Sequence, residues 1–214
     1  MKKTSLILSI VFTLPLLGGW SGAAQSKQDS LLFIWNNRTL PDTSRLKALD
    51  QLSLNLIEVN PDSAIYYAEI QYKHAMAKGL LKNAADALDG MGQAYEAKGE
   101  LLKASEYYNR ALKQYEETGN KKKTAYVLNN IGWLKWTEGK YIESIAYHRK
   151  SLAIAQAISD RDRESKALGG IAYSYFQQGQ YATAMQHVQK KLKICEEIED
   201  EYCEAWCLDA LGVF

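Results

Sequence analysis

The stretch Val127–Tyr141, VLNNIGWLKWTEGKY, decides the fold because its skeleton recurs at intervals of forty residues. Copies stand at Ala87–Leu101 (ALDGMGQAYEAKGEL) and Ala167–Tyr181 (ALGGIAYSYFQQGQY), and a fourth, CLDALGVF, begins at Cys207. Self-similarity with a period of about 20–50 residues is typical of stacked supersecondary units. The sequence therefore predicts a repeat architecture, which serves first as a scaffold.

A grid of twenty residues lies inside this period. Glycines and two substitutes occupy its slots, namely Gly79, Gly99, Gly119, Gly139, Ser159, Gly179 and Glu199. Glycine ends helices because it adopts the left-handed backbone conformation without steric cost. Each forty-residue unit is therefore predicted to be a helical hairpin. The predicted helices span 43–58, 61–78, 81–98, 101–118, 121–138, 141–158, 161–178, 181–198 and 201–214.

Helix starts and the scarcity of proline support an all-α chain. Asp42, Thr43 and Ser44 offer capping side chains ahead of the first predicted helix, and Asn60 precedes Pro61 at the second. No proline follows Pro61, so nothing beyond it breaks a helix. The predicted fold is a right-handed α-solenoid of stacked antiparallel helical hairpins. It covers 43–214 with about four hairpins and a truncated last helix.

Small residues recur in the middle of the first helix of each unit. Leu88, Leu128, Leu168 and Leu208 are each followed four residues later by Gly92, Gly132, Ala172 and Gly212. Mid-helix glycine lowers helix propensity, so its recurrence requires a packing reason. We expect a close approach by the second helix, where Ala104, Ser144 and Ala184 offer matching small side chains.

These positions resemble the tetratricopeptide repeat (TPR) family. Leu88, Met91-Gly92, Tyr95, Gly99, Ala104 and Tyr108 match its pattern, and Leu128, Ile131-Gly132, Gly139 and Ser144 match it again. The chain departs from the pattern at Lys135, which replaces a Tyr, and at His148 and Val188, which replace an aromatic residue. The forty-residue period exceeds the usual 34 residues of the family and looks like its long-repeat variant.

The N-terminus has the three-part pattern of a secretory signal peptide. Lys2 and Lys3 precede the apolar run Leu6–Leu17, and small residues follow up to Ala24. We predict a signal peptide over 1–24 and a leader over 25–42, whose apolar patch Leu31–Trp35 packs on the first helix. The alternative is a retained N-terminal anchor. The protein is expected to be exported, either periplasmic or facing the periplasm.

Composition excludes some partners. Lys and Arg number 26 against 25 Asp and Glu, which gives a net charge of +1 and leaves no basic stripe for nucleic acid. The resemblance to the TPR family instead implies a concave groove, lined by the first helix of each hairpin, that binds a protein or peptide.

The candidate groove residues form a stripe that varies between copies. Tyr126, Asn129, Trp133 and Trp136 share one helix face, because they are spaced three, four and three residues apart. Neighbouring copies add Asp89 and Gln93 at an acidic end with Asp86 and Glu96, and Tyr173 and Phe176 at an end with Lys166. The alternative is that Trp133 and Trp136 only pack against adjacent first helices. The chaperone-tail clamp of some family members is disfavoured, because Asp89 and Gly169 occupy the slots equivalent to Asn129.

Motifs for catalysis and cofactors do not occur in the sequence, so we expect no enzyme activity, cofactor or metal within these residues. His74, His148 and His187 stand alone on second helices and are interpreted as surface or packing residues. Cys195, Cys203 and Cys207 are predicted to be buried thiols, with a disulfide from Cys195 to one of the other two as the alternative.

The ends of the chain suggest a larger parent. The sequence stops half-way through a hairpin at Phe214, and its start, with Leu40–Thr43 and Asn60–Ala64, resembles the exported sensory region of bacterial TPR signalling proteins. That resemblance implies a membrane attachment beyond Phe214 and an output such as a class III nucleotide cyclase, a histidine kinase or a helix-turn-helix regulator. Two functions remain: an exported TPR interaction or sensory module, and the regulatory input of a longer membrane signalling enzyme.

Overall fold

The computed structural model describes residues 22–213, all of whose regular elements are helices, and the side chains of residues 27–212. The helices are α1 (Gly22–Asn36), α2 (Asp42–Leu56), α3 (Pro61–Ala77), α4 (Leu81–Ala97), α5 (Leu101–Glu117), α6 (Lys121–Thr137), α7 (Tyr141–Ala157), α8 (Arg161–Gln177), α9 (Tyr181–Glu197) and α10 (Glu201–Val213). Each predicted helix matches one of α2 to α10 to within two residues at either end. Residues 1–21 of the predicted signal peptide lie outside the described residues.

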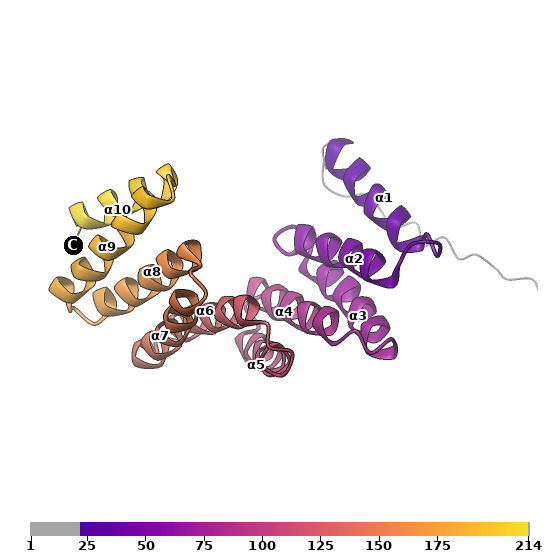
Figure 1. Ribbon diagram of the computed structural model, residues 1–214, viewed down its shortest axis with the longest axis horizontal. Helices are drawn as coiled ribbons and strands as arrows, with labels where there is room; N and C mark the ends of the chain where they lie inside the picture. Colours follow the sequence, from indigo (N-terminus) through magenta and orange to yellow (C-terminus); the bar gives the residue numbers. More distant parts are fainter. Residues whose placement is uncertain (1–21, 214) are drawn as a thin grey trace, which may run out of the picture.

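Successive helices pack side by side as antiparallel hairpins. Every helix contacts the next one along the chain, and α2 also contacts α4, as α6 contacts α8. The array is curved, with α2, α4, α6 and α8 on the inner side and α3, α5, α7 and α9 on the outer side (Figure 1). Among the described helices, none has the length and apolar character needed to cross a membrane.

Helix α1 was not predicted, because the leader 25–42 carries no repeat signal. Leu31 is nevertheless buried against Leu49 and Leu52 of α2, so the expected packing of the apolar patch on the next helix is observed. The guanidinium of Arg45 lies 4.6 Å from the ring centroid of Trp35, and its Nε donates to the Trp35 carbonyl oxygen at 2.8 Å. Contacts with α2 therefore hold α1 in place.

The turn grid has the predicted backbone geometry. The five glycines of the grid have φ between 66° and 74°, and Ser159 and Glu199 have φ of 55°. Side chains at positive φ are strained, so the two substitutes hold a conformation that their neighbours impose. The turns thus share one backbone conformation, whether glycine or another residue occupies the slot.

Capping agrees with the sequence at α3 and differs at α2. The backbone N–H of Ser63 donates to Asn60 Oδ1 at 3.1 Å, and Pro61 opens the helix as predicted. Helix α2 instead begins at Asp42 after Pro41 and has no side-chain cap. The Asp42 carboxylate binds Arg45 at 2.8 Å and His74 at 2.9 Å, so an ion-pair cluster replaces the predicted cap.

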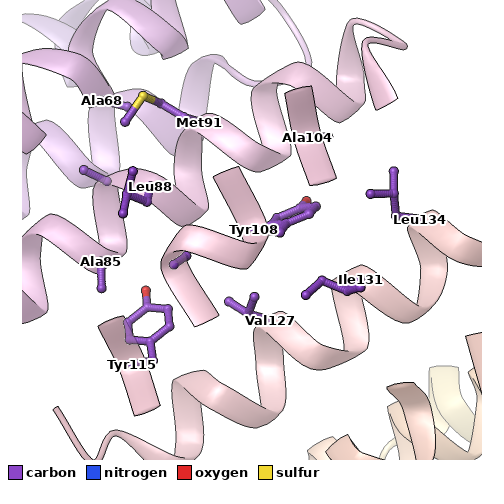
Figure 2. Close-up of a cluster of buried hydrophobic side chains, with 12 residues drawn as sticks. Ala68, Ala85, Leu88, Met91, Ala104, Tyr108, Tyr115, Val127, Ile131 and Leu134 are labelled. Carbon is purple, nitrogen blue, oxygen red and sulfur yellow. The ribbon is translucent and has the colours of Figure 1, made fainter. Parts of the chain in front are cut away.

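The mid-helix glycines receive large side chains, which corrects the expectation of small residues facing one another. A Cβ on Gly92 would lie 2.6 Å from the ring of Tyr108, which is fully buried. Val127 and Ile131 of α6 point toward the same region from the other side (Figure 2). Tyr108 therefore fills a space that exists because Gly92 lacks a side chain.

The next two hairpins repeat this arrangement with inserted and receiving side chains of different sizes. A Cβ on Gly132 would lie 2.7 Å from the imidazole of His148, and one on Gly170 would lie 2.3 Å from it. In the following hairpin the receiving residue is Ala172 and the inserted side chain is the smaller Val188. The departures from the family pattern at 148 and 188 are therefore matched in volume by their partners.

We predict that Gly132→Ala destabilises the fold through His148. Overpacking costs about 1–3 kcal/mol, whereas Ala in place of Gly gains about 1 kcal/mol of helix propensity. The free energy of unfolding, measured by urea denaturation, should therefore fall by up to about 2 kcal/mol.

The control is the same change in a His148→Val background, which copies the Ala172–Val188 pair. There Gly132→Ala should be neutral or stabilising, so the two changes should couple by about 0.5–3 kcal/mol. Equal effects of Gly132→Ala in both backgrounds would show that His148 does not determine the small residue.

Candidate functional site

Aromatic rings from three first helices form a continuous stripe, which we call the aromatic stripe. Trp133 and Trp136 of α6 have ring centroids 5.9 Å apart and lie 5.6 Å and 6.2 Å from that of Tyr173 on α8. Tyr173 lies in turn 5.3 Å from Trp206 on α10. All four rings are partly buried. The structure thus brings three predicted groove residues together on successive first helices.

Trp206 belongs to this stripe although it was not predicted. Its Nε1 donates to the Tyr173 hydroxyl at 3.2 Å, and the Lys191 ammonium lies 3.8 Å from its ring centroid. The repeat period contains the signal, since Trp206 stands eighty residues after Tyr126, in the same slot of the hairpin. The predicted stripe does not include it, because the last helix is predicted only as a truncated one.

Two predicted groove residues, Asn129 and Phe176, contact other side chains of the same hairpin or turn. Asn129 Oδ1 lies 2.9 Å from Nδ1 of the buried His148, and the Trp133 ring also packs on that imidazole at 5.3 Å. Phe176 packs on Tyr181, with centroids 5.3 Å apart. Asn129 therefore connects the stripe to the interior of the α6–α7 hairpin.

The alternative predicted for Trp133 and Trp136, packing against adjacent first helices, agrees with contacts in the structure. Trp133 and Trp136 do touch Tyr173 on the adjacent first helix, and Trp136 Nε1 is buried with no hydrogen-bond acceptor in the described structure. The rings therefore contribute to the solenoid and also present partly exposed edges.

The acidic end combines surface and interior carboxyl groups. Asp86 accepts hydrogen bonds from Lys123 at 2.9 Å and from the Tyr115 hydroxyl at 2.7 Å. Asp89 is only 3% exposed, and its Oδ1 has no partner among the described residues. Burial raises the pKa of Asp89 to about 7, while the Lys123 charge and the Gln93 amide partly lower it. Asp89 thus lies beneath the surface, beside Gln93.

A cavity of about 310 Å³ opens at this end. Gln93, Glu96 and Tyr126 line it on the inner helices, together with Glu58 and Asn130. Burial raises the pKa of the Glu96 carboxyl, although the hydrogen bond that Tyr108 donates at 2.6 Å opposes the shift. The cavity therefore presents carboxylates and amides on a partly desolvated floor.

Tyr126 lines the acidic cavity and stands on α6 seven residues before Trp133 of the aromatic stripe. The Arg163 guanidinium lies 5.1 Å and the Lys123 ammonium 6.0 Å from its ring centroid. Burial is the main cause that raises the pKa of its hydroxyl. The acidic cavity and the aromatic stripe together form one surface, which we call the inner surface.

The histidines and cysteines have varied settings. His148 is buried, His74 contacts Asp42, and His187 stacks on Tyr175 with centroids 5.6 Å apart. Cys195 and Cys203 form a disulfide, so the preferred expectation of three free thiols is wrong and its alternative is confirmed. The third residue, Cys207, is a buried thiol as predicted.

Comparisons with known proteins agree with the geometry. Residues 83–157 match the tetratricopeptide repeat family model. The fold is that of a TPR array. No curated protein sequence matches the chain.

Solved structures with this fold share little sequence with the chain. They include BtubC (BKLC) from P. vanneervenii (TM-score 0.67, 18% identity, 83% of this chain and 74% of that one). A Rap protein complexed with Competence and Sporulation Factor follows (TM-score 0.70, 15% identity, 90% and 62%). A signal transduction ATPase (STAND) with a tetratricopeptide repeat sensor from Pyrococcus horikoshii is also similar (TM-score 0.76, 15% identity, 89% and 30%). The chain therefore spans less than two thirds of the Rap protein and under a third of the ATPase.

We predict opposite pH dependences for two buried groups of the TPR array. Asp89 has a pKa raised from 3.8 to about 7, so the folded state holds a proton that the unfolded state loses, and its contribution to stability is lost as pH rises from 4 to 7. Burial lowers the pKa of His148 from 6.5 to about 3, so stability is lost as pH falls from 6.5 to 3.

The measurement is the free energy of unfolding of Asp89→Asn and His148→Gln, relative to the native protein, across pH 4 to 8. Asp89→Asn should gain about 2–4 kcal/mol relative to the native protein as pH rises, and His148→Gln should gain as pH falls. A difference profile of the same sign for both variants would contradict the assignment.

Proposed function

We propose that the chain is an exported TPR interaction or sensory module that binds a peptide or protein segment on its inner surface. The observation that carries the proposal is the continuity of the aromatic stripe with an acidic cavity along successive first helices. Partly exposed Trp and Tyr side chains are the residues that most often dominate binding energy in protein interfaces. TPR arrays are, moreover, generally scaffolds without catalytic activity.

The two ends of the inner surface carry opposite charges, and this difference constrains the ligand. Glu58 and Glu96 line the cavity at one end of the inner surface, whereas Lys191 lies over the Trp206 ring at the other end. A carboxylate pair over a desolvated floor favours a Lys or Arg side chain. The ligand proposed is thus a segment with a basic residue followed by apolar or aromatic residues.

Buried atoms without partners support a ligand at this position. Among the residues that the structure describes, Trp136 Nε1 finds no acceptor and Asp89 Oδ1 finds no donor. Most buried polar atoms are paired, so each exception needs a physical reason. A bound backbone carbonyl beside Trp136 would supply one of the missing partners after a small rotation of the ring. The Rap protein of the comparison, which is complexed with a factor, gives the proposal further support.

Selection from a displayed library of random peptides tests this function. We expect enriched peptides to carry a basic residue next to apolar ones, and Trp133→Ala and Trp136→Ala to weaken their binding by about 10–100-fold. Glu96→Gln keeps the acceptor for Tyr108 and should weaken binding by about tenfold. Leu102→Ala and Ile142→Ala, which alter exposed apolar residues of the outer helices α5 and α7, are the matched controls.

Stability is measured in parallel for every variant. If Trp133→Ala unfolds the chain, Trp133→Phe retains an aromatic ring and provides the binding test. Selections that yield no peptide, or peptides whose binding depends on Leu102 or Ile142 and not on the inner surface, would refute the proposal.

Export is part of the same proposal. The charged, apolar and small-residue segments before Ala24 support it, as does the Cys195–Cys203 disulfide, since such bonds persist in oxidising compartments.

Mass spectrometry of the protein isolated from a bacterial host tests the export step. The mature N-terminus is expected near Gln25, in the periplasmic fraction. A chain that retains Met1–Ala24 would argue against cleavage, and recovery in the cytoplasm alone would argue against export.

We propose as the second candidate that this array is the regulatory input of a longer membrane signalling enzyme. The support is the STAND protein, which has a tetratricopeptide repeat sensor and of which this chain covers only 30%. The complete coding region decides between the two: a membrane helix followed by a catalytic domain favours this candidate, and a stop after one capping helix favours the first.

A further inference from the structure

Three cysteine sulfurs converge between α9 and α10, in the buried cluster against which Trp206 of the aromatic stripe packs. The Sγ atoms of Cys195, Cys203 and Cys207 all lie within 4.8 Å of one another, and those of Cys195 and Cys207 are 4.0 Å apart. Cys203 and Cys207 lie one helical turn apart on α10, so both face Cys195 on α9. Cys195 and Cys207 are fully buried.

We propose that reduction of the Cys195–Cys203 disulfide turns these three cysteines into a site for a thiophilic divalent metal ion, Zn²⁺ in particular. Thiolates at about 2.3 Å from a tetrahedral Zn²⁺ lie about 3.8 Å from one another. The Cys195 and Cys207 sulfurs are already 4.0 Å apart, and those of Cys195 and Cys203 would separate to this spacing once their bond is reduced. Soft thiolate ligands select such ions over Mg²⁺ or Ca²⁺. The fourth position would be left to water or a substrate group.

The repeat itself holds the three positions together, so the disulfide is not needed to bring the sulfurs close. The equivalent residues forty and eighty positions earlier are Ala155, Arg163 and Ala167, and Tyr115, Lys123 and Val127. Tyr115 and Val127 lie in one buried cluster, and the Lys123 ammonium lies 5.8 Å from the Tyr115 ring centroid. The same three slots therefore meet between α5 and α6 without any disulfide, and we expect them to meet in the reduced chain.

The surroundings favour an anionic metal centre. Three thiolates around a divalent cation carry one net negative charge, and Lys191, a partly buried neighbour of Cys207, has no ion-pair partner within the described part of the chain. A bound cation would favour the deprotonated thiols.

The chemistry balances with a dithiol as reductant. The dithiol gives two electrons and two protons to the disulfide, is itself oxidised to a cyclic disulfide, and leaves Cys195 and Cys203 as thiols. Metal binding then releases the protons of the three thiols to solvent. Oxidation would remove two ligands at once, so the site would be open only under reducing conditions.

Titration of the full chain with Cd²⁺ and Zn²⁺, in the reduced and in the oxidised form, tests the proposal. The reduced form should bind one ion per chain, with a sulfur-to-Cd²⁺ charge-transfer band, and the ion should protect all three cysteines from alkylation as counted by mass spectrometry. Oxidised protein, with Cys207 as its only thiol, should show no such band. Reduced, folded protein that binds no ion, or an oxidised form that binds equally well, would overturn the proposal.

Cys207→Ser is the discriminating variant because it leaves the disulfide pair intact. Its affinity in the reduced form should fall on the order of 100-fold, as expected when one of three thiolates is lost. Unchanged affinity would reduce the site to a simple dithiol and contradict the proposal. Circular dichroism checks folding, and if this variant is unfolded the alkylation count on the native sequence still decides.

Discussion

In the three hairpins from α4 to α9, the array depends on one contact, in which a side chain of the second helix enters a space left by a small residue of the first helix. Tyr108 enters the space at Gly92, His148 enters between Gly132 and Gly170, and Val188 packs at Ala172. Interiors are close-packed, so a change of volume on one side requires a compensating change on the other. Tyr108 and His148 accordingly meet glycines, whereas the smaller Val188 meets an alanine.

This interior contact also shapes the inner surface. His148 fixes Asn129 by a hydrogen bond and supports the ring of Trp133 from below. Because burial holds His148 neutral, its Nδ1 and Nε2 offer one donor and one acceptor between them, and only Nδ1 finds a partner among the described residues. The buried imidazole of His148 therefore positions Asn129 and Trp133 on α6. Changes at His148 would thus alter the inner surface as well as the fold.

The sequence predicted the helices because their signals are local and periodic. The glycine grid works even at Ser159 and Glu199, where spacing alone placed a turn that the residues themselves do not favour. Helix α1 and the occupant of the glycine space depend on long-range contacts, which the spacing of small residues does not reveal. Within the stripe, helical periodicity grouped Trp133 with Trp136, whereas the burial of Asp89 and the disulfide partner of Cys195 required knowledge of how neighbouring helices face each other.

Stacking also explains why different chemistry can occupy one slot without change of fold. The turn at Glu199, between Cys195 and Cys203, has the same φ as the turn at Ser159, where no cysteine is near. The turn therefore keeps this backbone angle with and without cysteines beside it. A solenoid holds each slot through its neighbours, and side chains that meet there, whether an aromatic ring with a lysine or three cysteines, acquire their proximity from the repeat. Binding chemistry on such an array is thus a matter of which residues occupy slots that already face one another.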